Sequence, residues 1–204
     1  LDTSDAGAIY CGRDWTLGGN RILGNFIHHL GKASHHQNWA IYLDDMASGI
    51  EVSRNVIVDT DAGFLIGGGR SNLITNNLIS GCPKQSIVFD ARATGWAKSH
   101  VKKHDGTLWQ RLNKMPFKSK PWKSRFPYLS NIEGDHYAEP RRNTLKDNLL
   151  YSTPSMQLNK LVTDHGTVIG NVDSKSKSTI HLKNRQLIIP NKDLKTFSKM
   201  LIGP

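Results

Sequence analysis

The sequence predicts an all-β fold, a parallel β-helix, and two repeated patterns carry that prediction. In the first pattern a short aliphatic stretch is followed by an asparagine and further aliphatic residues. In the second, a strand-like apolar segment ends at a polar or glycine-rich turn. Repeats with a period of about 20–50 residues are typical of stacked architectures, in which each unit buries its apolar face only against its neighbours.

The first pattern occurs five times, and its asparagines are separated by 30, 22, 71 and 23 residues. An asparagine side chain both donates and accepts hydrogen bonds, and it tolerates the left-handed conformation of a turn. Asparagines at the same turn of stacked coils can therefore bond to one another. We expect a ladder made of Asn25, Asn55, Asn77, Asn148 and Asn171.

The second pattern repeats in step with the first, in IYCGRD, IYLDDM, FLIGGG and IVFDAR. Alternation along a strand sends successive side chains to opposite faces, which fixes the expected faces. The expected inward residues are Ile9, Cys11, Ile41, Leu43, Phe64, Ile66, Ile87 and Phe89, and the expected outward columns are Tyr10–Tyr42–Leu65–Val88 and Gly12–Asp44–Gly67–Asp90.

Composition limits the class of protein and its partners. A length of 204 residues suits one domain, and no apolar run approaches the roughly 18 residues of a membrane span. The net charge of +10 favours an acidic partner, such as an anionic polysaccharide. No nucleic-acid-binding motif is present, so nucleic acid is not the expected partner.

The 71-residue gap divides the chain into three expected parts. Residues 1–173 form the β-helix, residues 93–142 interrupt it as a basic, aromatic-rich loop and helix insertion, and residues 174–204 form a C-terminal tail or cap. Within the insertion, residues 105–115 predict a short helix with Leu108, Leu112 and Met115 on one face. In the tail we expect a strand at 186–189 and a cap helix at 193–201.

The ends and the cysteines add two further expectations. The repeats begin almost at Leu1, so we expect another chain, or a missing N-terminal segment, to cover the first coil. Cys11 falls in an inward column and is expected to be a small buried hydrophobic residue. A disulfide between Cys11 and Cys82 stays open at this point.

Several segments carry a resemblance to a known group of proteins: GAIYCGRDW, GNRILGNFIHHL, AIYLDD, IGGGRSNLITNNLI, FDARATGWAK and MPFKSKPWKSRFPYL. Together they resemble secreted right-handed parallel β-helix proteins of the pectate-lyase-like superfamily, over roughly residues 5–172. The resemblance implies a single-stranded right-handed solenoid, an extracellular location and carbohydrate activity. Lyases, hydrolases, xylosidases and fucosidases all share that fold, so the reaction stays open.

The outward column predicts a pair of carboxylates. Asp44 and Asp90 stand two coils apart, about 10 Å along the axis, with Gly67 leaving an open notch between them. Glycoside hydrolysis needs two such carboxyl groups on either side of the glycosidic bond. The expected catalytic residues are Asp44, Asp45, Asp90 and Asp14.

Tyrosines, arginines and histidines are expected around these carboxylates. Aromatic rings provide platforms for sugars, and arginines bind uronate or sulfate groups. The expected substrate-binding residues are Tyr42, Tyr10, Arg13, Arg70, Arg92, His28 and His29. No metal site is expected, and we expect no cofactor, although clustered aspartates leave calcium open.

Three functions follow, of which hydrolysis is favoured by the aspartates. A polysaccharide lyase acting on an anionic glycan would instead need a base such as Arg13, Lys98 or Tyr42. For Arg13 and Asp45 a purely structural role is also open, in which they form an ion pair. The third interpretation is a non-catalytic glycan-binding, matrix or assembly subunit that keeps the fold.

Overall fold

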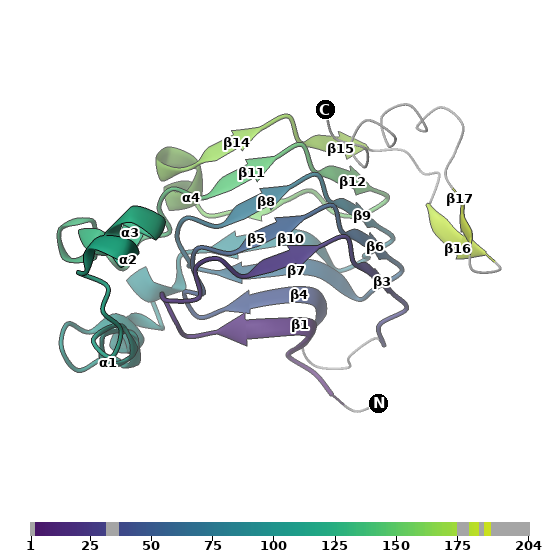
Figure 1. Cartoon of the computed structure of the whole chain (residues 1–204). Coiled ribbons are helices and arrows are strands. Elements are labelled where there is room, and N and C mark those ends of the chain that lie inside the picture. The colour runs from purple at the N-terminus through teal and green to yellow at the C-terminus, as the bar shows by residue number, and fades with distance from the viewer. Residues whose placement is uncertain (1–2, 32–36, 175–179, 184–185, 189–204) are drawn as a thin grey trace.

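In a computed structural model of the chain, three parallel five-stranded sheets stack around one apolar core (Figure 1). The structure describes residues 3–31, 37–174, 180–183 and 186–188. This arrangement is consistent with the predicted parallel β-helix. Each set of three successive strands adds one strand to each sheet, and we call such a set a coil.

The strands of each sheet come from successive coils. Sheet A contains β1 (Ala6–Gly12), β4 (Asn38–Asp44), β7 (Ala62–Gly67), β10 (Gln85–Asp90) and β13 (Gln157–Leu158). Sheet B contains β2 (Arg21–Leu23), β5 (Glu51–Ser53), β8 (Leu73–Thr75), β11 (Thr144–Lys146) and β14 (Thr167–Ile169). Sheet C contains β3 (Phe26–His28), β6 (Val56–Val58), β9 (Leu78–Ser80), β12 (Leu149–Tyr151) and β15 (Val172–Ser174).

The predicted asparagine ladder is confirmed. The Asn25 backbone N–H and side-chain amide both donate to the side-chain oxygen Oδ1 of Asn55, at 2.9 and 2.8 Å. The same two bonds recur at each following step. A second, shorter ladder was not predicted: the Asn72 N–H donates to the Asn143 side chain, and the Ile50 N–H donates to that of Asn72.

The predicted faces of sheet A are also confirmed. Ile9, Ile41, Phe64 and Ile87 share one register, and the alternate residues pack into the same core. Tyr42 and Leu65 do point away from that core, yet they are buried in a small outer cluster with Trp39 and Ala62. Tyr10, in the same column, is 56% exposed.

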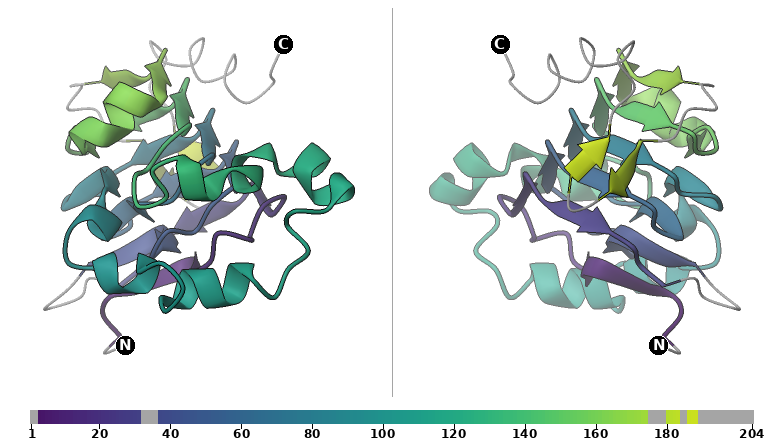
Figure 2. Two further views of the ribbon diagram at one scale, coloured as in Figure 1. Left: turned by 90° about the vertical axis from the view of Figure 1, so that its left-hand side faces the viewer. Right: turned by 90° about the vertical axis from the view of Figure 1, so that its right-hand side faces the viewer.

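Residues 91–143 leave the stack between β10 and β11 and carry most of the helices. They form η1 (Arg92–Thr94), η2 (Lys98–Val101), α1 (Thr107–Leu112), α2 (Lys120–Arg125), α3 (Pro127–Ser130) and η3 (Ile132–Gly134). Figure 2 shows this segment on one side of the strands. It has its own apolar cluster, which includes Trp109 and Leu129 and closes over Trp15 and Met46 of the first two coils. α1 is shorter than predicted, and Met115 lies beyond it and is exposed.

Arg70 fastens this segment to the stack. Its side chain is 1% exposed and donates to the Asp135 carboxylate at 2.9 Å and to the carbonyl oxygens of Asp135, His136 and Glu139. Burial lowers the pKa of Arg70 to about 10, which still leaves the guanidinium charged at neutral pH. The segment is thus held by a buried ion pair as well as by apolar contacts.

The remaining elements are one helix of the fifth coil and a strand pair after the stack. α4 (Lys160–His165) lies between β13 and β14, and the side chain of Asn159 accepts from the Leu161 N–H and caps the helix. An antiparallel pair, β16 (His181–Lys183) and β17 (Gln186–Ile188), follows the stack. Before it, Ile180 packs on Leu149 and Tyr151 outside sheet C. The expected cap helix at 193–201 lies outside the described residues.

Cys11 and Cys82 are both free thiols. Burial raises the pKa of each to about 11, so neither is a nucleophile at neutral pH. In the described part of the chain, no helix has the length and apolar character needed to cross a membrane.

Candidate functional site

The candidate site lies where the strands of sheet A end. Three carboxylates and two guanidinium groups meet there, and we call them the arginine–carboxylate network: Arg13, Asp44, Asp45, Asp90 and Arg92. They come from coils one, two and four, because the shared register of β1, β4, β7 and β10 brings the four strand ends together. With three negative and two positive groups, the network holds one carboxylate in excess.

Arg92 is the centre of this network. Its Nε and Nη2 donate to the Asp90 carboxylate, while its Nη1 donates to Asp44 and, at 3.2 Å, to Asp45. Burial acts to lower the pKa of Arg92, but the hydrogen bonds and charges of these partners raise it well above its usual range. Arg92 therefore stays charged and holds the carboxylates of Asp44 and Asp90 at different edges of one guanidinium.

Two glycines make room for this packing. A Cβ at Gly67 would lie 2.5 Å from the Arg92 guanidinium carbon, and a Cβ at Gly12 would lie 2.8 Å from the Asp44 Cβ. The sequence predicted that Gly67 leaves an open notch, and this prediction was wrong in one respect. The room exists, but the side chain of Arg92 fills it.

Asp45 is the most enclosed of the three carboxylates, with its side chain 2% exposed. It accepts from Nε of Arg13 at 2.9 Å as well as from Arg92. Burial acts to raise the pKa of Asp45, but the hydrogen bonds from the two arginines outweigh burial and lower it. Asp45 is therefore ionised at neutral pH, and the Arg13–Asp45 ion pair that the sequence left open is present.

Asp90 is the most accessible carboxylate of the network, with its side chain 34% exposed. It lines an open depression of about 320 Å³ together with Val88, Leu158, Gln157 and Asn159. Gln157 and Asn159 come from the fifth coil and were not among the predicted site residues. The depression thus combines a carboxylate, two amides and aliphatic side chains.

Two exposed aromatic rings flank the network. The hydroxyl of Tyr10 donates to Asp44 at 2.8 Å, and its ring packs edge-on against Tyr42. Trp96 is 71% exposed, and the Arg92 guanidinium lies 5.4 Å from its ring centroid. Sequence reasoning missed Trp96 as a site residue, although the motif FDARATGWAK places it four residues after Arg92.

The other predicted site residues lie elsewhere or have other partners. Asp14 accepts from the backbone and hydroxyl of Thr16 and so closes its own turn. Arg70 is buried against Asp135 and does not reach the network. His28 and His29 are exposed at the end of β3 in sheet C (Figure 1), their Nδ1 atoms 2.9 Å apart. Among the described residues, no His, Cys, Asp and Glu side chains gather into a group of three suited to a metal ion.

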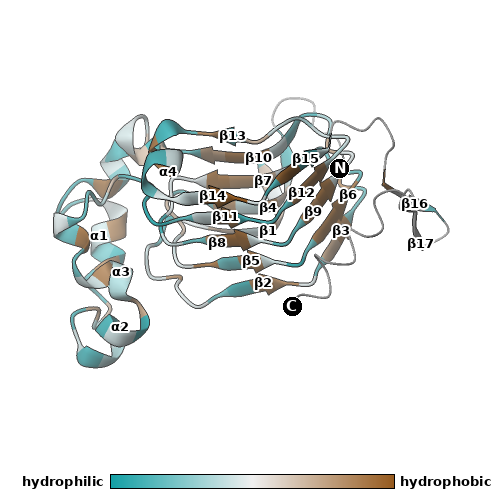
Figure 3. Ribbon diagram, turned by 90° about the horizontal axis from the view of Figure 1, so that it is seen from above, coloured by the Kyte–Doolittle hydropathy of each residue, from teal (hydrophilic) through white to brown (hydrophobic). Residues whose placement is uncertain are grey.

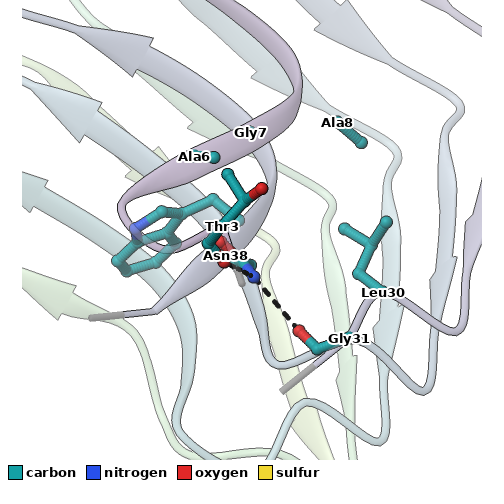
Figure 4. Close-up of a pocket in the computed structure, with 8 residues that line it drawn as sticks. Thr3, Ala6, Gly7, Ala8, Leu30, Gly31 and Asn38 are labelled. Atoms are coloured by element: carbon teal, nitrogen blue, oxygen red, sulfur yellow. Dashed lines mark hydrogen bonds between the residues drawn. The ribbon is translucent and has the colours of Figure 1, made fainter. Parts of the chain in front are cut away.

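A second cavity, of about 180 Å³, lies by the start of β1 and β4 (Figure 4). Its lining includes Ala6, Gly7, Leu30 and Trp39, and the Asn38 side-chain amide donates there to the carbonyl oxygen of Gly31. Among the described residues, none of the side chains that line it is titratable near neutral pH.

Comparison with known proteins gives no family to the chain. The sequence matches no protein-family model, and searches among curated proteins and solved structures found no match.

Proposed function

We propose that this chain is an extracellular, carbohydrate-active protein of the right-handed parallel β-helix type and that it hydrolyses glycosidic bonds. The observation that carries the proposal is the placement of Asp44 and Asp90 at different edges of the Arg92 guanidinium, with Asp90 lining an open depression. Glycoside hydrolysis uses two carboxyl groups on either side of the scissile bond, one as acid and one as base or nucleophile.

The network suggests a role for each residue. Asp90 is exposed to the depression and can meet a sugar directly, and Asp44 lies across the guanidinium from it. Asp45 is nearly fully buried and bonds both arginines, so its role is to position them.

The neighbouring aromatic rings support a carbohydrate as the substrate. Exposed rings of tryptophan and tyrosine offer apolar faces with a polar edge, which suits the mixed apolar and hydroxyl surface of a sugar. Tyr10 and Trp96 are both exposed, and each contacts a member of the network.

A non-catalytic glycan-binding role is the second candidate, and one observation favours it. Arg92 stands between Asp44 and Asp90, where the reacting oxygen and water would have to lie. Gly67 leaves room for the Arg92 side chain in this place. A protein with this site could hold sugar on its rings without cleaving it.

The geometry supports a lyase less well. Partial burial, the hydrogen bond to Asp44 and nearby negative charge raise the pKa of Tyr10 to about 12. Burial raises the pKa of Tyr42, and the hydrogen bond to Asp45 raises that of Arg13. The candidate bases Tyr42 and Arg13, like the neighbouring Tyr10, keep their protons at neutral pH, whereas a lyase base must accept one.

Asparagine substitutions separate the first two candidates. We expect Asp90→Asn and Asp44→Asn each to lower the release of reducing ends from a polysaccharide panel by about 10²–10⁴-fold. The matched control is Asp164→Asn, which changes an exposed aspartate paired with Lys160 and should leave the rate unchanged. If the unsubstituted chain binds a glycan of the panel but releases nothing, hydrolysis is wrong and the binding role stands.

A further inference from the structure

The helical segment beside the stack carries an unneutralised basic surface. Between Gly106 and Ile132 the sequence contains lysines and arginines but no aspartate or glutamate. All of these basic side chains are exposed, and we call them the basic face: Arg111, Lys114, Lys118, Lys120, Lys123 and Arg125. We infer that the basic face binds an anionic polysaccharide, one bearing uronate or sulfate groups.

These charges are free to meet a ligand. Across the described residues, no member of the basic face forms an ion pair, whereas Lys102 and Lys103 of the same segment pair with Asp105 and Glu133. Six like charges that no neighbouring carboxylate neutralises create a positive potential that attracts a polyanion. Lys102 and Lys103 have carboxylate partners, whereas the lysines and arginines between Gly106 and Ile132 have none among the described residues.

The segment presents these charges on a packed support. Leu108, Leu112 and Phe117 lie in the apolar cluster of the segment, and Trp122 and Phe126, in and beside α2, pack against it partly buried. The buried Arg70–Asp135 ion pair fastens the same segment to the stack. Lys118 stands 5.5 Å from the Phe117 ring centroid, and Arg125 stands 5.6 Å from that of Phe126. In Figure 3, α2 is largely hydrophilic and lies away from the strands. Charges held in place lose less conformational entropy when they bind a ligand.

The basic face adjoins the candidate site. Arg111 donates to the backbone carbonyl of Arg13 at 2.7 Å, and the side chain of Arg13 belongs to the arginine–carboxylate network. At the other end, an Arg125 nitrogen would lie 3.7 Å from a Cβ placed on Gly19. The basic face therefore starts at the network and follows the turn of the first coil.

The contact between the basic face and the network indicates which polymer binds. A glycan chain bound at the network can continue onto the basic face. The inference therefore rests on the proposed function in taking the polymer to be a polysaccharide. It does not depend on whether the site cleaves the bond. The positive charge would restrict binding to acidic chains, since a neutral glycan gains nothing from it.

The test measures binding to dextran sulfate, with uncharged dextran of the same length as the neutral reference. We expect the triple variant K118Q/K120Q/K123Q to bind dextran sulfate about tenfold more weakly than the unsubstituted chain at low salt. The control K102Q/K103Q/K160Q removes the same charge from lysines that already have acidic partners, and it should lose less than twofold. Added salt should erase the difference, because it screens exposed charges.

Each other outcome overturns the inference. Equal losses in the two triple variants would mean that net charge alone attracts the polymer. Duplex DNA binding as tightly as dextran sulfate would assign the face to nucleic acid. To keep this test separate from catalysis, both triple variants are also compared in the Asp90→Asn background. The tenfold difference between them should persist there even if hydrolysis is lost, so either proposal can fail alone.

Discussion

Two sets of buried polar side chains hold this molecule together, and they do so in different ways. The asparagine ladder is neutral and repeats the same two hydrogen bonds from coil to coil. The contacts of Arg70 and Arg92 are charged, and each joins positions that occur once. A repeated polar contact stabilises the stack, whereas a unique charged one fixes a particular segment or site.

The largest effect is expected at Arg70. Arg70→Met keeps a long apolar stem but leaves Asp135 and three carbonyl oxygens without their buried donor. Asp135 keeps Arg142 as a partner, so the loss comes chiefly from the three carbonyl oxygens, and we expect the free energy of unfolding to fall by about 4 kcal/mol. Urea unfolding measures this loss, and limited proteolysis should cut first within residues 93–142. The control is Arg142→Met, because the Arg142 side chain also pairs with Asp135 but is 53% exposed. This substitution should lower the free energy of unfolding by less than about 1 kcal/mol. Equal losses in the two variants would contradict the role given to Arg70.

A smaller loss is expected in the middle of the ladder. Asn77→Ala removes the acceptor of two Asn55 donors and the donor to the Val52 carbonyl, all in a fully buried place. Leaving these groups unsatisfied should cost about 3 kcal/mol, read from the urea midpoint at constant slope. Asn171→Ala, at the more open end of the ladder, should cost about 1 kcal/mol. A ladder that contributes nothing would give two equal and small losses.

The smallest effect is a change in pH dependence. The folded-state pKa of Asp45 lies below its unfolded value of about 4, so its contribution is present above pH 4 and disappears as the pH falls through the folded pKa. Asp45→Asn should therefore be less stable than the unsubstituted chain at pH 7, and its stability should decline less steeply as the pH falls below about 4. Thermal unfolding across this range measures it. Asp135 and Glu51, whose pKa values are also lowered, should preserve part of the decline.

The periodic features could be predicted from the sequence because the same residue types recur at the same positions of successive coils. The ladder and the inward columns of sheet A recur at least four times, so one register explains them all. The shorter Asn72–Asn143 ladder has too few members to stand out.

The unique contacts could not be predicted, because nothing local specifies them. Asp135 lies 65 residues after Arg70, and only the folded segment brings them together. Arg92 was expected to bind a substrate. Its guanidinium reaches Asp44 only because Gly67, on the coil between them, has no side chain. Alternation identified the column that carries the carboxylates, but it could not show which of them the arginines would enclose.

The ladder spans its longest gap without any change in its bonds. The step from Asn77 to Asn148 closes a loop of 71 residues, while the step from Asn55 to Asn77 closes one of 22. Because the entropy of closing a loop grows only with the logarithm of its length, the longer step is disfavoured by about 1 kcal/mol. One turn of this stack can therefore acquire some fifty residues of new surface for less than a single buried hydrogen-bonding group contributes, and binding or regulatory segments can be exchanged there while the sheets stay the same.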